Sequence, residues 1–531
     1  MRKNKDIENL KTSWGELKND RFNFELIEGY FRKKDNSEEF QVLSDKTCND
    51  LDFEELFMFL DRTSSNVGQQ YLYNKLRTIP WRDGHINSDE KIIDELTNDE
   101  DFRLRTQKLL CKLKKGDSYY ISAIFQDEHI EPPKWFYIIR LLSFTSFLSL
   151  LMLPFNFRFI IILIFVVIVN LGFHYWNKKN LYQYIGSIPQ LLTLNNIAKK
   201  LHKCEQFNVI NPGLSDSIKV IDQVRNRMAF CSLENNVQGD FAVVYWALLE
   251  IIKILFLLEP LMLFSILKRL NTKRREIEDV FSFVGQIDTL ISIASLREGL
   301  ETYCHPVVNK KENSILATNA YHPLVVDCVP NNISVTDKSI LLTGSNMSGK
   351  TSFIRTIGIN MITGLTINTC FAKSITIPKM GIYSAIRISD DLLNDRSYYF
   401  EEVLTIKEMI QEATNGKPNL FLLDEIFKGT NTVERISAGK AVLSSLSKNG
   451  NIVFVSTHDI ELTDMLTDDY ELYHFSEIID DKNIAFDYKL KAGKLKNRNA
   501  IRILQINDYP DNVIKEAIEI SERLDKKTST S

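Results

Sequence analysis

One stretch of the chain has the composition and spacing of a phosphate-binding loop. The segment 341–356 reads "LLTGSNMSGKTSFIRT", and its part "GSNMSGKT" satisfies G-x-x-x-x-G-K-[ST] in full. A strand-like run precedes it and a helix-like run follows, which is the context that the motif requires. Backbone N–H groups and the helix N-terminus favour phosphate, the lysine reaches the β- and γ-phosphates, and the threonine hydroxyl ligates magnesium. The predicted nucleotide-binding residues are Gly344, Ser345, Asn346, Met347, Ser348, Gly349, Lys350, Thr351 and Ser352.

Two further runs supply groups for hydrolysis. "NLFLLDE" predicts a buried strand that ends at Asp424 and Glu425. Asp424 is placed to hold magnesium together with Thr351, and Glu425 is placed as the general base for water. "NIVFVSTH" predicts a neighbouring strand with His458 at its carboxyl edge, where a polar residue can sense the γ-phosphate. The sequence thus predicts an ATPase that uses ATP and Mg²⁺, with Glu425, Lys350 and His458 as catalytic residues.

The elements that must position these residues differ along the chain. Residues 306–525 alternate short β-branched runs with helical segments, which predicts a mostly parallel α/β domain, followed by a frayed tail at 526–531. Residues 1–130 and 181–305 look helical. Within the first of these regions, Asp50 is expected to cap a helix through Leu60, and Thr63 or Ser64 the next helix, which Pro80 ends.

Between the two helical regions, residues 131–180 contain an apolar hairpin. The interior of segment 135–176 holds only two formal charges, Arg140 and Arg158, and Pro154 begins a natural turn. Each arm approaches the ~20 residues that cross a bilayer, and aromatic residues with flanking lysines lie at both ends. A two-pass hairpin with both ends in the cytoplasm is predicted. The alternatives are a shallow re-entrant hairpin, because of Arg158, and a buried hairpin in a soluble core.

A second apolar stretch, 241–267, carries charges. It contains Glu250, Lys253 and Glu259, with Pro260 beside the last. A charge at mid-bilayer costs at least ~2.5 kcal/mol, so one long buried or interfacial helix is favoured over a third crossing. Glu250 and Lys253 are spaced to pair on one helix face.

Composition limits the possible classes of protein. Lys and Arg total 65 against 69 Asp and Glu, a formal charge of −4, so any nucleic-acid contact must rest on local basic runs such as 268–275 and 491–498. Seven scattered cysteines have neither zinc nor disulfide spacing, which indicates a reducing compartment and no structural metal. The first 20 residues lack the apolar core of a cleaved signal peptide.

Three of these segments together resemble the ATPase domain of the MutS family, which belongs to the ABC-type ATPases. They are "TGSNMSGKTSFIRTIGIN", "LFLLDEIFKGTNTVE" and "STHDIELTDML". The resemblance covers roughly 315–517, and more weakly includes 51–80 and 284–299, which resemble parts of the family's lever or core domain. It implies an α+β multidomain protein. An N-terminal all-α lever/core domain would carry the inserted apolar hairpin, ahead of a C-terminal α/β P-loop ABC-type ATPase domain.

The resemblance also implies roles for single residues. Ser397 would contact the γ-phosphate across a dimer interface, and Glu402 would match the acidic residue of that signature segment. Tyr488 falls where an aromatic side chain stacks on adenine. Cys328 stands where a second stacking aromatic is common, so a looser base pocket is expected, and Asp508 replaces a glycine. The family's composite sites imply a homodimer with two ATP sites.

Two functions remain open at this stage. No mismatch-reading domain is recognised, and the Phe-x-Glu spellings at Phe53 and Phe400 lie inside other elements. The favoured function is a MutS-type ATPase that binds mismatched or distorted DNA and is tethered to the inner membrane by 135–176, with its ATPase domain in the cytoplasm. The alternative is a membrane-embedded mechanochemical ATPase that acts on a protein or lipid and has no role on DNA. A buried hairpin would instead make the protein cytoplasmic.

Overall fold

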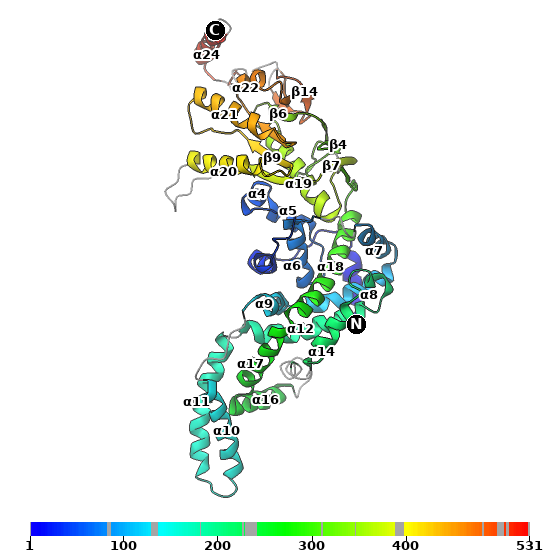
Figure 1. The fold of residues 1–531 in the computed structure, drawn as a ribbon, viewed down its shortest axis with the longest axis vertical. Helices are drawn as coiled ribbons and strands as arrows, with labels where there is room; N and C mark the ends of the chain where they lie inside the picture. Colours follow the sequence, from blue (N-terminus) through cyan, green and yellow to red (C-terminus); the bar gives the residue numbers. More distant parts are fainter. Residues whose placement is uncertain are drawn as a thin grey trace. The chain divides into compact units, whose positions relative to one another are not determined.

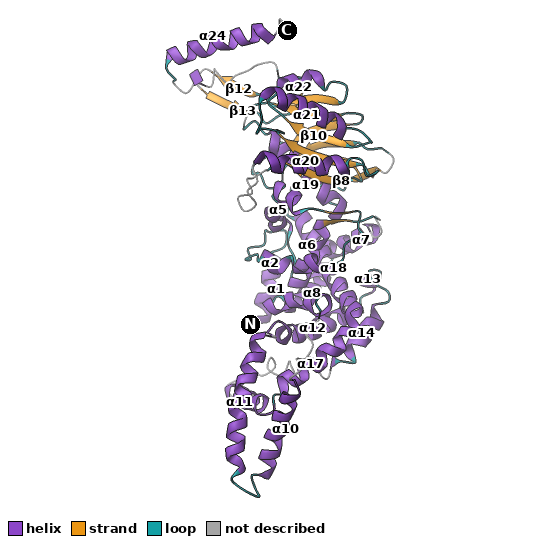
Figure 2. Ribbon diagram, turned by 60° about the vertical axis from the view of Figure 1, so that its left-hand side comes forward, coloured by secondary structure: helices purple, strands orange, loops and turns teal. Residues whose placement is uncertain are grey.

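The fold was analysed in a computed structural model of the 531-residue chain. It describes residues 2–81, 86–128, 136–180, 182–225, 228, 242–309, 312–345, 347–387, 398–480, 483–495, 504–505 and 509–528. The chain divides into two compact units. The first comprises 1–38, 57–77 and 82–300, and the second comprises 39–56, 78–81 and 301–531. Both helices and sheets are present, as the α+β prediction requires (Figures 1 and 2).

The first unit is built around a long helix, α18 (Arg274–Glu298), which packs along α6 (Asn66–Arg77). Glycines allow the close approach, because a Cβ at Gly68 would lie 2.2 Å from Asp288 Oδ2. Around this pair lie α1 (Arg2–Thr12), α2 (Phe24–Ile27), α3 (Gly29–Lys33), α7 (Ile86–Asn98), α8 (Glu100–Leu110), α9 (Ile121–Gln126), α12 (Tyr182–Leu201), α13 (Glu205–Asn208) and α14 (Leu214–Asp222). Three short 3₁₀ turns, Cys111–Leu113, Gly116–Tyr120 and Asn271–Lys273, also belong to this unit, as do the helices of the two apolar stretches described below.

The predicted cap of α6 is wrong by one or two residues. Ser65, rather than Thr63 or Ser64, accepts the hydrogen bond from the Gly68 N–H, at 3.0 Å. The buried carboxylate of Asp288 accepts two more bonds, from the backbone N–H groups of Ser64 (2.8 Å) and Ser65 (2.7 Å). The start of α6 is therefore fixed by a distant acidic residue as well as by its own cap.

Residues 39–56 do not belong to the helical unit, in contrast to the predicted 1–130 region. β1 (Gln41–Val42) pairs antiparallel with β2 (Thr78–Ile79), so this region is not all-α. The helix expected through Leu60 is present as α5 (Phe53–Leu60), and a separate short helix, α4 (Asp45–Asp50), precedes it. Ser44 caps α4, and Asp50 is its last residue rather than a cap. The Asp50 carboxylate is used elsewhere, as an acceptor for Ser384, Ile386 and Arg387 in the second unit.

The apolar segment forms the predicted helical hairpin. α10 (Phe136–Met152) and α11 (Phe159–Asn180) pack side by side (Figure 1). Large apolar side chains point outward along both arms, for example Phe144 (62% exposed) and Phe165 (67% exposed). Among the described residues, two helical stretches have the length and composition to cross a membrane. They are Phe159–Trp176, of which 17% is buried, and Leu258–Glu298, whose apolar 18-residue portion is 83% buried. The second is largely core of the first unit. Trp135, one of the aromatic residues expected to anchor the ends of the segment 135–176, lies outside the described residues.

The second apolar stretch is not the single helix expected. It forms α16 (Ala242–Phe256) and α17 (Leu258–Leu270), which are separated at Leu257, where φ is +46°. Pro260 lies in the first turn of α17, where its missing N–H leaves no helix bond unmade. The predicted pairing of Glu250 with Lys253 is confirmed at 3.8 Å.

The second unit contains the mostly parallel sheet. Its six strands run in the order β14-β11-β6-β10-β9-β8, and only β14 is antiparallel to its neighbour. The strands are β6 (Ser339–Thr343), β8 (Gly381–Ala385), β9 (Asn419–Asp424), β10 (Ile452–Ser456), β11 (Tyr470–His474) and β14 (Lys491–Ala492). The three strands predicted from the apolar runs, β6, β9 and β10, are central and adjacent.

Helices cover both faces of this sheet. Successive strand side chains alternate between faces: Phe421 and Leu423 of β9 join one core cluster, which includes residues of α20 (Tyr398–Glu412), α21 (Thr432–Leu446) and α22 (Ile460–Met465). Figure 2 shows these three helices over the strands. On the other face, α19 (Lys350–Ile367) packs so closely that a Cβ at Gly358 would lie 2.6 Å from Leu422.

A smaller sheet and peripheral elements complete this unit. Its strand order is β3-β7-β4-β5, with β3 (Val307–Asn309), β4 (Ile315–Ala320), β5 (Asn331–Val335) and β7 (Ser374–Pro378). β12 (Glu477–Asp480) pairs with β13 (Asn483–Phe486), and α24 (Asp511–Thr528) is the last helix.

Candidate nucleotide site

The glycine-rich loop joins the buried strand β6 to helix α19. Gly344 and Gly349 have φ values of +150° and +105°, which side chains other than glycine rarely adopt. A Cβ at Gly344 would lie 2.7 Å from the carbonyl oxygen of Phe475, so the loop also needs glycine there for space. Met347 is 82% exposed at the tip. Asn346 lies outside the described residues.

Lys350 and Thr351 are the first two residues of α19. Lys350 faces the loop, and Thr351 faces the neighbouring strands. The Lys350 ammonium donates to the carbonyl oxygens of Gly344 (2.8 Å) and Ser345 (2.9 Å), and burial lowers the pKa of this lysine. Thr351 Oγ1 donates to Asp424 Oδ2 at 2.8 Å. Ser456, at the end of β10, donates to the other oxygen of the same carboxylate. The tertiary structure therefore joins the two predicted magnesium ligands directly.

Glu425 follows β9 in a strained turn that brings its carboxylate to His458. Its φ is +51°, and its backbone N–H donates to Ser456 O at 2.9 Å. The carboxylate lies 2.9 Å from His458 Nε2 and 2.9 Å from Lys428 Nζ. Hydrogen bonding to His458, followed by that to Lys428, lowers the pKa of Glu425 to about 2. The predicted base is therefore ionised at neutral pH, which a proton acceptor requires.

Glu402 acts inside its own chain. It is fully buried on α20, and its carboxylate accepts a hydrogen bond from the backbone N–H of Phe427. Phe427 also has a positive φ, +60°, so Glu402 supports the strained turn that carries Glu425. Glu402 is also the residue that the MutS resemblance matches to the acidic position of the signature segment. Ser397, the predicted contact across the dimer interface, and Asp508 lie outside the described residues.

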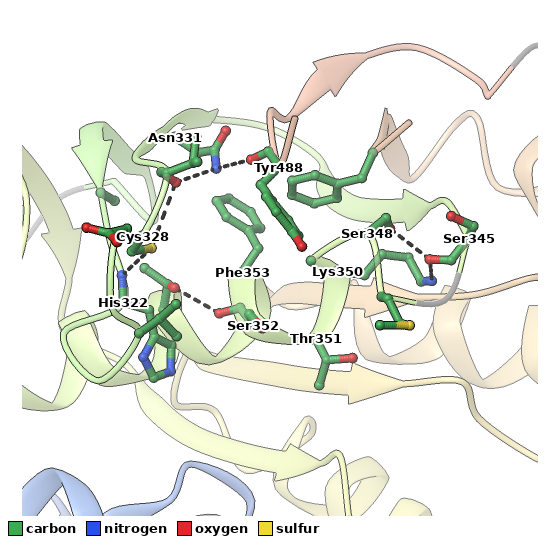
Figure 3. A pocket seen from close by; sticks show the side chains of 18 of the residues that line it. His322, Cys328, Asn331, Ser345, Ser348, Lys350, Thr351, Ser352, Phe353 and Tyr488 are labelled. Atoms are coloured by element: carbon green, nitrogen blue, oxygen red, sulfur yellow. Dashed lines mark hydrogen bonds between the residues drawn. The ribbon is translucent and has the colours of Figure 1, made fainter. Parts of the chain in front are cut away.

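A pocket of about 550 Å³ lies beside the loop. Figure 3 shows His322, Cys328 and Asn331 on one side, Ser345, Ser348 and Lys350 on the other, and Tyr488 between them. Both Cys328 and Tyr488, the residues predicted to frame the base, line it. The remaining lining residues are Ala320, Val325, Val326, Asp327, Val329, Met347, Gly349, Thr351, Ser352, Phe353, Thr356, Glu425 and Phe475.

Two residues of this pocket were not identified from the sequence. His322 is 5% exposed. Its ring Nδ1 accepts a hydrogen bond from the Leu324 N–H at 3.3 Å, and its backbone N–H donates to Cys328 Sγ at 3.3 Å. Burial, with nearby Arg355, lowers the pKa of His322 to about 4. Asn331 Nδ2 donates to Tyr488 O at 2.9 Å and thereby fixes the aromatic residue. His322 lies in the segment "YHPLV" (321–325) and Asn331 in "VPNNI" (329–333), and neither residue belongs to a motif of its own.

A carboxylate from the segment 39–56 also reaches the loop helix. Asp52 lies 3.0 Å from Arg355 of α19 and 2.6 Å from Arg387 after β8. This bridge links the helix that starts at Lys350 to the end of the edge strand. No local sequence signal joins residues that are so far apart in the chain.

The residues at the loop fit a nucleotide with magnesium. Ser345 Oγ is buried with no hydrogen-bond partner among the described residues, and it lies in the loop itself. A paired hydroxyl and carboxylate, Thr351 and Asp424, are oxygen donors of the kind that magnesium prefers. Within the described chain, no cluster of His, Cys, Asp and Glu suits another metal.

The fold and the site define a mixed α/β unit with a glycine-rich loop between a buried parallel strand and a helix. Part of the chain matches one known protein family. Residues 340–525 match the family described as MutS domain V. The chain is similar to DNA mismatch repair protein MutS of Aquifex pyrophilus (29% identity over 256 residues), of Petrotoga mobilis (29% over 273) and of Oceanobacillus iheyensis (30% over 267).

These similarities support a relationship to the MutS family, a family of ATPases. The matched region is 46% of this chain and 29% of the Aquifex pyrophilus relative, 49% and 33% for Petrotoga mobilis, and 47% and 30% for Oceanobacillus iheyensis. The chain thus spans about a third of the length of the relatives that it matches.

Proposed function

We propose that this protein hydrolyses ATP at the loop 344–351, as a MutS-type ATPase. The observation that carries the proposal is the meeting of Thr351, Asp424, Glu425 and His458 at the carboxyl ends of three adjacent strands. ATP with Mg²⁺, when bound, supplies the phosphoryl group and the charge that polarises it.

The roles of this chain's own groups follow from their positions. Lys350 and the loop N–H groups bind phosphate oxygens, and Thr351 and Asp424 hold the metal. Glu425 accepts a proton from water at its carboxylate, and His458 orients that carboxylate through the 2.9 Å contact. Tyr488 and Cys328 flank the base. Ser397 is assigned to the site of a second copy, so that a homodimer holds two composite sites.

Mismatched or distorted DNA is proposed as the ligand that this ATPase serves. Its support is the similarity to relatives named DNA mismatch repair protein MutS. The hairpin α10–α11 is proposed to tether the protein to the inner membrane, with the ATPase domain in the cytoplasm. The outward apolar side chains of both arms support this part.

A second candidate function is favoured by the same hairpin and by the net charge of −4. In it, the protein is a membrane-embedded mechanochemical ATPase that acts on a protein or lipid without a role on DNA. The two functions differ in what stimulates hydrolysis.

The test is ATP hydrolysis by the purified full-length chain with homoduplex, mismatched or branched DNA, and with liposomes. We expect Glu425→Gln to retain ATP binding and to lower turnover by roughly 10²–10⁴-fold, the usual contribution of a general base. Glu461→Gln, an exposed carboxylate on α22, is the matched control and should keep wild-type turnover. Normal turnover by Glu425→Gln would refute its role. Stimulation by liposomes but by no DNA would favour the second function.

A further inference from the structure

The turn that follows β9 contains two residues in the left-handed region, and each is held by an acceptor outside the turn. Glu425 has a φ of +51° and Phe427 a φ of +60°, a strained conformation that persists only where the surroundings hold it. The Glu425 N–H donates to the carbonyl oxygen of Ser456 at 2.9 Å. The Phe427 N–H donates to the Glu402 carboxylate. The conformation of this turn therefore depends on groups that the turn itself does not contain.

The Glu402 carboxylate reaches the turn from one face of α20. Its side chain is fully buried. Tyr399, three residues earlier, lies on the same helix face, and its ring centroid is 6.3 Å from that of Phe427. A Cβ at Gly429 would lie 2.9 Å from Tyr399 Cβ, so the helix and the turn are closely packed. This face of α20 thus meets the turn at Phe427 and at Gly429.

The Glu402 side chain serves the turn as a hydrogen-bond acceptor. Its other oxygen, Oε2, is buried and has no hydrogen-bond partner among the described residues. Glutamine at this position would keep an acceptor for the Phe427 N–H and would break no bond at the second oxygen. A side chain of similar length without oxygen would leave a buried N–H group unpaired, which is costly.

The position of the Glu425 carboxylate depends on the same turn. Between Glu425 and Phe427 lies Ile426, which is 5% exposed and belongs to the core cluster on one face of the sheet. Lys428, the next residue, lies 2.9 Å from the Glu425 carboxylate, and His458 Nε2 lies 2.9 Å from its other oxygen. A change in the Phe427 peptide would therefore move groups on which the carboxylate depends. A displacement of about 1 Å at a reacting group can cost roughly 10²-fold in rate.

We propose that Glu402 is a positioning residue for the general base Glu425. Through the Phe427 N–H it holds the turn 425–427 in the conformation that keeps the base in place, and it does so within its own chain. This role rests on the proposed ATPase function and adds to it a buried residue that acts through the backbone. It differs from the intersubunit position that the resemblance to the MutS signature segment implies for Glu402.

The first experiment needs no nucleotide. Amide hydrogen exchange is measured at single-residue resolution on the full-length chain in detergent micelles. We expect Glu402→Met to accelerate exchange of the Phe427 amide roughly tenfold or more, because its acceptor is removed, while the amides of β10 remain unchanged. Glu402→Gln should retain the protection of the wild type. Glu408→Met, which removes an exposed carboxylate from the same helix, is the matched control.

Two results of this experiment would overturn the proposal. One is equal protection of the Phe427 amide in Glu402→Met and in the wild type, which would show that the carboxylate does not hold the turn. The other is an equal acceleration at the β10 amides, which would show that Glu402 supports the whole sheet rather than the turn.

The second experiment is ATP hydrolysis by the same variants. Glu402→Met should lower kcat by roughly 10–100-fold and leave KM for ATP within about twofold, because the base is displaced and the nucleotide loop is not. Glu402→Gln and Glu408→Met should keep the wild-type kcat. A kcat of Glu402→Met equal to that of the wild type, an equal loss in Glu402→Gln, or a change in KM alone would each overturn the positioning role.

Failure of the proposed ATPase function would look different. It would appear as absent hydrolysis in the wild type or as normal turnover in Glu425→Gln. Failure of the positioning role alone would appear only in the Glu402 variants, with Glu425→Gln still inactive.

Discussion

At the scale of single residues, the site is defined by hydrogen bonds that set charge states. His458 and Lys428 keep the Glu425 carboxylate ionised, and burial keeps His322 neutral. The Glu425 carboxylate is thus charged at neutral pH, and His322 presents an uncharged ring to the pocket. Part of each state arises from a neighbour that is distant in the chain, His458 for Glu425 and Arg355 for His322.

His322 gives the protein a pH-dependent loss of stability. Its pKa is about 4 in the folded protein against 6.5 for an ordinary histidine, so its contribution is present above pH 6.5 and is lost as pH falls through 4. The full loss is about 3 kcal/mol at 1.36 kcal/mol per pH unit. We expect His322→Gln to remove this loss, so that its stability relative to the wild type rises as pH falls from 6.5 to 4.

The measurement is the apparent melting temperature of the full chain at several pH values in that window. His305→Gln makes the same change at an exposed histidine of this unit and serves as the control. If the difference in melting temperature between the wild type and His322→Gln stayed constant from pH 6.5 to pH 4, the role of His322 would be contradicted.

At the scale of elements, the segment 39–56 is an integral part of the second unit. The side-chain amide of Gln41 donates to the carbonyl oxygen of Ile382 and accepts from the N–H of Ile382, at 2.8 Å each. Asp50 holds the end of β8 through the Ser384 hydroxyl (2.6 Å) and the N–H groups of Ile386 (3.0 Å) and Arg387 (2.8 Å). The edge strand of the sheet is thereby fixed from outside the sheet.

Replacing Asp50 with Asn should loosen the end of β8 locally. Hydrogen bonds to a buried charged acceptor contribute about 1.5–3 kcal/mol, and the amide retains only one acceptor oxygen. We expect exchange of the Ile386 and Arg387 amide hydrogens to accelerate by roughly 10–100-fold, with other strands of the sheet unchanged. Asp337→Asn, at an exposed position of the same unit, should leave these rates alone. Unchanged rates in Asp50→Asn would show that the carboxylate is not the stabilising group.

At the scale of the whole molecule, the hairpin α10–α11 exposes an apolar surface that a membrane or another protein would have to cover. Contiguous apolar surface of this extent is rare on soluble monomers and marks membrane or protein contact. Ile161, Phe165 and Ile168 lie at helical spacing on α11 and are 69%, 67% and 63% exposed. A bilayer would cover this face without any further protein.

The triple variant Ile161→Lys, Phe165→Lys, Ile168→Lys should lose membrane association. Each lysine costs about 2.5–3.5 kcal/mol at the centre of a bilayer-spanning helix. Flotation of the full-length protein with liposomes is the measurement, and replacement of the same three residues by leucine is the control, expected to float. Flotation of the lysine variant equal to that of the control would exclude insertion of this helix face.

Much of the nucleotide site was predictable from the sequence because its parts are local patterns. The loop 344–351 carries its glycines and lysine within eight residues, and the apolar runs of β6, β9 and β10 set both the strands and the position of Asp424, Glu425 and His458. The hairpin was predictable for the same reason, since composition and a proline turn suffice. The break at Leu257 was not, because nothing in the apolar run before it signals an αL residue.

What the sequence by itself determined is therefore the chemistry that each segment carries. The tertiary structure alone decided which segments meet. Asp50 and Ser384 are 334 residues apart, and His174 and Glu250 are 76 apart, so neither pairing leaves a periodic or spaced signal. Burial in the folded chain then sets the protonation states of the paired groups, because the removal of water and the contact with partners shift the pKa of a carboxylate or an imidazole.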